Sequence, residues 1–89
     1  MTRRVVVRYH GRVQGVGFRA TALYHGNGLE LHGFVRNEID GTVLMDVEGP
    51  KAHVDELLER IDSRPAGSVD RRDLSWEQPL GRTGGFTIG

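Results

Sequence analysis

Residues 11–19, between a run of valines and a helical pattern, read Gly11-Arg12-Val13-Gln14-Gly15-Val16-Gly17-Phe18-Arg19. Because glycine has no Cβ, Gly11, Gly15 and Gly17 allow tight or left-handed turns and a close approach of backbone N–H groups to a ligand. Successive N–H groups form a nest for an anion, and the N-terminus of the following helix adds the positive end of its dipole. The planar guanidinium of Arg19 can bind two oxygens of a tetrahedral anion at once. We therefore expect a phosphoryl-binding loop in this stretch.

Two other phosphate-binding patterns fit the loop less well. The Walker pattern fails because Val16 and Gly17 stand where it requires a glycine and a lysine. The dinucleotide fingerprint is matched by Gly15, Gly17 and Ala20, with Glu38 roughly where a ribose-binding acid would lie. A dinucleotide-binding sheet, however, needs two mononucleotide halves. A chain of 89 residues with two helical patterns cannot supply them.

The composition is that of an ordinary globular protein. Of its residues, 37% are hydrophobic and 27% are charged, and a length of 89 residues leads us to expect that residues 1–89 form a single domain with a modest core. The 12 basic and 12 acidic residues balance, which argues against nucleic acid as a partner. The chain has no cysteine, which excludes disulfides and thiolate metal sites. No signal peptide or membrane span is recognisable, so a cytoplasmic location is the expected one.

The hydrophobic pattern predicts the element order βαββαβ with a small terminal strand. Val5, Val6, Val7 and Tyr9 are typical of a central strand, and the segment from Phe18 onward is helical. The glycines of Gly26-Asn27-Gly28 should weaken the last turn of that helix, whose buried face we assign to Phe18, Ala22 and Leu29. The remaining predicted elements are strands Leu31 to Arg36 and Thr42 to Glu48, a helix starting at Pro50 that buries Val54, Leu57, Leu58 and Ile61, a half-exposed strand Val69 to Trp76, a loop Pro79 to Gly85 and an edge strand Phe86-Thr87-Ile88.

This order has a geometric consequence for Asn37. A βαβ connection joins parallel strands, so the loop after the first strand and Asn37 after the second come out at the same end of the sheet. In the split form of the unit, the third strand lies between the first two. Asn37 would then face the anion in the loop. Its carboxamide has an acceptor oxygen that can hold a water molecule and direct the lone pair of that water at phosphorus.

Two motifs resemble the signatures of the acylphosphatases. They are Gly11-x-Val13-Gln14-Gly15-Val16-Gly17-Phe18-Arg19 and Gly33-Phe34-Val35-Arg36-Asn37-x-x-x-Gly41-x-Val43, with Gly49 following. Both occur in the expected order and spacing, and the resemblance covers essentially the whole chain. Some positions depart from the family pattern and concern mainly the first helix: Tyr9, Gly26, Gly28 and Glu30.

The resemblance implies an enzyme that hydrolyses a small-molecule acyl phosphate to a carboxylate and phosphate, without metal or cofactor. It also implies an α+β, ferredoxin-like βαββαβ sandwich, with a mostly antiparallel sheet, two helices on one face and a short fifth strand. By motif, Arg19 and the backbone N–H groups of the loop would bind the phosphoryl group, and Asn37 would position the attacking water. The implied phosphate-binding residues are Gln14, Gly15, Val16, Gly17, Phe18 and Arg19. We expect the chain to be a monomer.

Two other functions fit part of the sequence. The same element order occurs in RNA-binding modules, but Asn37 replaces an aromatic residue of their motif and there is no basic platform. A non-catalytic module that binds phosphate or an acyl phosphate is the stronger alternative, although it would not need Asn37. We expect Phe18 and Phe34 in the core and Trp76 in packing. The histidines show no ligand spacing and are expected at the surface: His10, His25, His32 and His53.

Overall fold

The computed structural model describes residues 1–89 and contains five strands and two helices. Their order confirms the predicted βαββαβ pattern with a short terminal strand. The elements are β1 (Thr2–Arg12), α1 (Phe18–His25), β2 (His32–Asn37), β3 (Val43–Pro50), α2 (Lys51–Ser63), β4 (Ser68–Glu77) and β5 (Phe86–Ile88). Neither helix is long and apolar enough to cross a membrane.

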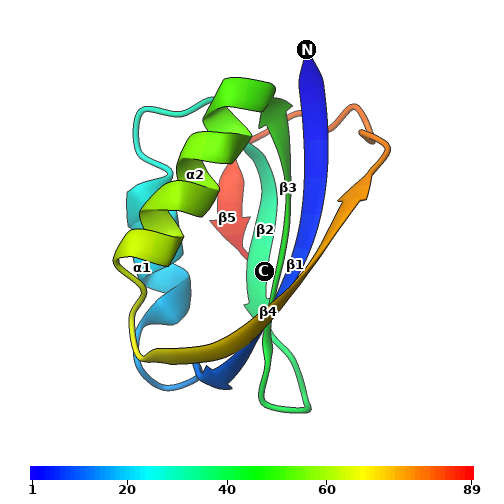
Figure 1. Cartoon of the computed structure of the whole chain (residues 1–89). Helices are drawn as coiled ribbons and strands as arrows, with labels where there is room; N and C mark the ends of the chain where they lie inside the picture. The colour runs from blue at the N-terminus through cyan, green and yellow to red at the C-terminus, as the bar shows by residue number, and fades with distance from the viewer.

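The strands form one sheet in the order β4-β1-β3-β2-β5. β3 lies between β1 and β2 and is antiparallel to both, so β1 and β2 run in the same direction. β5 is parallel to β2 at one edge, and β4 is antiparallel to β1 at the other. Figure 1 shows both helices on one face of the sheet. This is the predicted ferredoxin-like α+β fold.

The core lies between the helices and the sheet. Alternate residues of β1, namely Val5, Val7 and Tyr9, lie on the face of the sheet that the helices cover and are buried. This is the alternation expected of a strand that is covered on one face. The apolar stripe of α2 is buried as predicted, at Val54, Leu57, Leu58 and Ile61. The core is completed by the residues Val13, Phe18, Ala22, Leu31, Val35, Val43, Met45 and Val47.

Two helix boundaries differ from the prediction. α1 ends at His25, so Leu29 lies beyond the helix and not on its buried face. Gly26 closes the helix by donating its N–H to the carbonyls of Ala22 and Leu23, and Gly28 follows with a φ of +80°. Pro50 is the N-cap of α2 and not its first helical residue, because its ψ of 138° is extended.

Two side chains lie elsewhere than predicted. His25 is buried and not on the surface. Its Nε2–H donates a hydrogen bond to the carbonyl of Arg64 at 2.9 Å, which satisfies this ring nitrogen. Phe34 is half-exposed on the face of the sheet away from the helices. There the guanidinium groups of Arg36 and Arg82 lie 4.9 and 5.8 Å from its ring centroid. A cation over an aromatic face replaces the hydrocarbon packing that we expected for Phe34.

A charged cluster on the open face holds the C-terminal segment against the sheet. The carboxylates of Asp46 and Glu48 point away from the helices, yet both residues are buried. Asp46 accepts hydrogen bonds from Arg4 and Arg82, at 2.8 to 2.9 Å. Glu48 accepts the backbone N–H groups of residues 80–82. These bonds place the chain so that β5 can pair with β2.

The charged cluster should make folding stability depend on acidic pH. Burial opposes ionisation of Asp46, but the hydrogen bonds from Arg4 and Arg82 outweigh it and lower the pKa of Asp46 from 3.8 to about 2. A carboxyl with a lowered folded-state pKa stabilises the fold above pH 4 and loses that effect between pH 4 and pH 2, here roughly 2 kcal/mol. Urea unfolding across this range should show the loss. In the Asp46→Asn variant the free energy of unfolding should depend less on pH over this range. An unchanged pH dependence in that variant would contradict the role of Asp46.

Tyr9 carries a buried hydroxyl without a hydrogen-bond partner in the chain. Burial, reinforced by the nearby charge of Asp62, raises its pKa, so the hydroxyl stays neutral. An unpaired buried hydroxyl costs about 1–3 kcal/mol. Tyr9→Phe keeps the ring and removes this cost, so we expect the free energy of unfolding to rise by about 1 kcal/mol in denaturant titrations. A fall of that size would mean that the hydroxyl is satisfied.

Candidate active site

The glycine loop turns sharply from β1 into α1. Gly15 and Gly17 have φ values of +74° and +80°, in the left-handed region that glycine enters without steric cost. Gly17 is the N-cap of α1, and its carbonyl accepts the N–H of Thr21 at 2.9 Å. The loop therefore ends on the first turn of a helix, where backbone N–H groups have no partner within the helix.

Both ends of the loop are fixed by burial. Val13 and Phe18 are 1% and 2% exposed, and the ring of Phe18 packs on Tyr9 with the centroids 4.8 Å apart. On the other side, a Cβ added to Gly67 would lie 2.1 Å from the carbonyl oxygen of Arg12. Only glycine can occupy that position, because the chain entering β4 lies directly against the loop. The loop is thus held by the core and by β4.

Asn37 lies at the same end of the sheet as the loop. It is the last residue of β2 and pairs with Val43 of β3, which pairs on its other side with Tyr9 of β1. Strand alternation from the buried Val35 places the Asn37 side chain on the face that carries the helices. Its side chain is exposed and makes no hydrogen bond within the chain. The structure therefore brings Asn37 and the loop to one end and one face of the sheet.

Gln14 connects the loop to the turn after Asn37. Its Nε2 donates to the carbonyl of Glu38 at 2.7 Å and to the carbonyl of Thr42 at 2.9 Å. The sequence placed Gln14 among the phosphate-binding residues through its backbone. The linking role of the side chain was missed, since nothing in the sequence indicates which carbonyls it reaches.

Arg19 has a free guanidinium. The residue is half-exposed in the first turn of α1, and its side chain makes no hydrogen bond or ion pair within the chain. A cation at a helix N-terminus is electrostatically unfavourable by about 0.3–1 kcal/mol unless an anion is nearby. The position of Arg19 therefore favours an anionic ligand.

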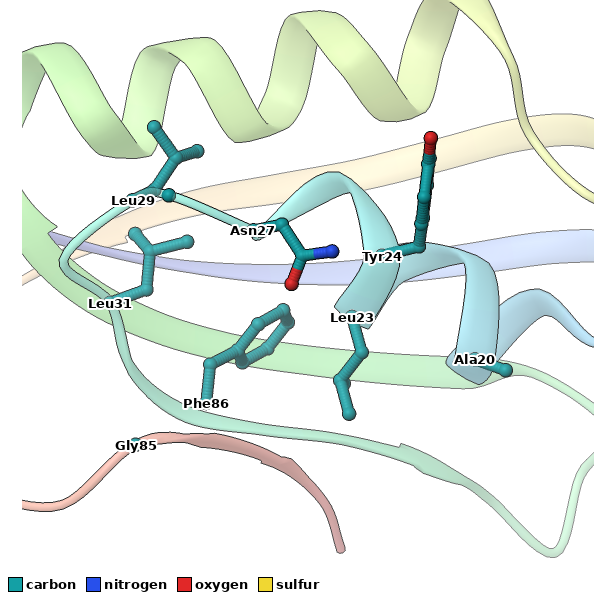
Figure 2. Close-up of a pocket in the computed structure, with 10 residues that line it drawn as sticks. Ala20, Leu23, Tyr24, Asn27, Leu29, Leu31, Gly85 and Phe86 are labelled. Atoms are coloured by element: carbon teal, nitrogen blue, oxygen red, sulfur yellow. The ribbon is translucent and has the colours of Figure 1, made fainter.

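The largest hollow on the surface lies outside this group of residues. It is a groove of about 490 Å³ along the outer side of α1, and neither Arg19 nor Asn37 lines it. Figure 2 shows Phe86 of β5 between Leu23 and Leu31, with Ala20 at the start of the helix. Six of the ten lining residues are hydrophobic, and none has a charged side chain. The groove therefore cannot supply the charge that a phosphoryl group requires.

Comparison with known proteins decides the family. The family model described as Acylphosphatase matches residues 5–88, which includes both glycine-containing motifs. The chain belongs to the acylphosphatase family. It is similar to the acylphosphatase of Salinibacter ruber, with 37% identity over 97% of this chain and 92% of the relative. It is also similar to that of Anaeromyxobacter dehalogenans, with 43% identity over 96% of this chain and 90% of the relative.

A solved structure agrees with these sequence comparisons. The crystal structure of acylphosphatase from Bacillus subtilis matches with a TM-score of 0.87 and 27% identity, over 100% of this chain and 99% of that one. The expected family, the fold and the enzyme class are therefore confirmed. This acylphosphatase is a hydrolase whose substrate is a small-molecule acyl phosphate.

Proposed function

We propose that Arg19 and the backbone N–H groups of residues 14–19 hold the phosphoryl group while Asn37 positions the water that attacks phosphorus. The observation that carries the proposal is the pair of hydrogen bonds that the Gln14 side chain donates to the carbonyls of Glu38 and Thr42. These bonds join the loop directly to the turn that follows Asn37. The groups that would hold the phosphoryl group and the water therefore belong to one hydrogen-bonded unit. Reaction rates depend steeply on such relative placement.

The proposed reaction is direct displacement at phosphorus. The water oxygen forms a bond to phosphorus, and the bond between phosphorus and the acyl oxygen breaks, with its electron pair leaving on the carboxylate. A phosphoryl oxygen of the substrate accepts the proton of the water. Because a carboxylate is a good leaving group, the reaction needs little general-acid help, and positioning with charge stabilisation supplies most of the catalysis.

The proposal requires neither a metal nor a cofactor. The phosphoryl oxygens carry the negative charge to be stabilised, and the chain offers the Arg19 guanidinium and the N-terminus of α1 at this place. We further propose that residues 1–89 act as a single acylphosphatase-like domain and as a monomer, since both motifs come from one chain. The cytoplasmic location stays a prediction from the sequence.

Turnover with a chelator present tests the metal-free proposal. The purified protein should hydrolyse a small acyl phosphate at the same rate with and without the chelator, and inorganic phosphate should inhibit competitively. Loss of activity that a divalent metal restores would contradict the metal-free mechanism. Phosphate binding without any turnover would instead identify the alternative, a non-catalytic phosphate or acyl-phosphate binding module.

A further inference from the structure

The turn that follows Asn37 is held from the open face of the sheet by Arg8 of β1. The neighbours of Arg8 along the strand, Val7 and Tyr9, are buried beneath the helices, so Arg8 points to the opposite face. Its Nη1 donates to Oγ1 of Thr42 at 2.7 Å, and its Nη2 donates to Oε1 of Glu38 at 3.5 Å. One guanidinium thus contacts both ends of the turn.

Each residue that Arg8 contacts is fixed by a further bond. Oε2 of Glu38 accepts a hydrogen bond from Nε of Arg36 at 2.9 Å. Oδ1 of Asp40 accepts the backbone N–H of Thr42 at 3.0 Å and its hydroxyl at 2.6 Å, which closes the turn. The second carboxylate oxygen of Asp40 lies 3.7 Å from Nη1 of Arg8. Arg8 is therefore the centre of a network that includes the whole turn.

This network lies on the side of the turn opposite the Gln14 bonds. Gln14 holds the carbonyls of Glu38 and Thr42 from the loop, while Arg8 holds their side chains from the open face. Building on the proposed function, we infer that Arg8 is a positioning residue for the hydrolysis, because its bonds to Thr42 and Glu38 prevent the turn from rotating and so fix the direction of the Asn37 carboxamide.

The role of Arg8 concerns orientation more than stability. The side chain of Arg8 is 34% exposed, and its two ion pairs are long, at 3.5 and 3.7 Å. Partly exposed ion pairs of this kind contribute little to the free energy of folding. The short bond to Thr42 instead fixes the position of the turn that follows Asn37. A small displacement of a group next to the reacting atoms can strongly change the rate of hydrolysis.

Arg8→Ala should lower kcat by about threefold to tenfold and leave inhibition by inorganic phosphate unchanged, because the loop and Arg19 are untouched. Arg8→Lys, which keeps the charge and one donor, should recover part of the loss. Arg71→Ala is the matched control. It removes an arginine from the same face of the sheet, one that is paired with Asp73 and not with the turn, and should leave kcat unchanged.

A double-mutant cycle separates positioning from a general effect of charge or folding. If Arg8 acts through Asn37, then Arg8→Ala should have no further effect on kcat in a chain that already carries Asn37→Ala. Additive losses, or a loss that appears in phosphate inhibition, would overturn the inference. A wild-type chain without turnover would refute the proposed function instead. In that case amide exchange of Glu38, whose N–H donates to the carbonyl of Thr42, would still report whether Arg8→Ala loosens the turn.

Discussion

Asn37→Ala should lower kcat by about 10²-fold or more while inhibition by inorganic phosphate stays nearly intact. The expected loss is on the scale of removing one preorganised polar group from a reacting centre. Asn37 is exposed and makes no side-chain bond within the chain, so its removal should leave the melting temperature almost unchanged. Steady-state hydrolysis, phosphate inhibition and thermal unfolding of the variant would measure the three expectations together.

Asn27→Ala is the matched control for this variant. Asn27 is also an exposed asparagine next to a turn, but it follows the C-terminal end of α1, away from the loop. The control should hydrolyse substrate at the wild-type rate. If Asn37→Ala weakened phosphate binding and spared turnover of bound substrate, Asn37 would be a phosphate ligand and not the residue that positions water.

Arg19→Ala should lower kcat/KM by roughly 10²- to 10³-fold and weaken phosphate inhibition as well. The guanidinium would contact the phosphoryl oxygens in both the bound substrate and the transition state, and charge-assisted bonds are the strong ones. The same change should slightly raise the stability of the free protein, because it removes a cation from the helix N-terminus. Kinetics should show the fall in kcat/KM, and thermal unfolding without phosphate should show the small rise in stability.

Two further variants test whether the effect belongs to Arg19 itself. Arg12→Ala removes an exposed cation from the end of β1, next to the loop, and should lower activity far less, since general attraction of an anion is shared among many charges. Arg19→Lys keeps the charge and loses the planar fork, so it should restore only part of the activity. Equal losses in Arg12→Ala and Arg19→Ala would contradict a specific role for Arg19.

Much of the fold could be predicted because local patterns and packing agree in this chain. The alternation of β1 and the helical spacing of α2 each have a single reasonable interpretation. The βαβ rule then makes β1 and β2 parallel, and the split form of the unit places β3 between them. The predicted element order also placed Asn37 and the loop at one end of the sheet. The boundaries of α1 and α2 were less predictable, because glycine and proline can each occupy several positions near a helix end.

The contacts that hold the site could not be predicted from the sequence. Arg8 and Gln14 reach residues 24 to 34 positions away, and the sequence does not show which of many acceptors a long side chain will meet. Phe34 was misplaced for a related reason. Its aromatic ring suggested the core, but the alternation of β2 from Val35 puts it on the open face, where Arg36 and Arg82 cover it.

Hydrolysis in water enriched in oxygen-18 tests the proposed displacement most directly. If the water held by Asn37 attacks phosphorus, the label should enter inorganic phosphate and be absent from the carboxylate, as mass spectrometry of both products in a single turnover would show. Label in the carboxylate would mean that water attacks the acyl carbon. The roles assigned to Asn37 and to the phosphoryl-binding loop would then be wrong.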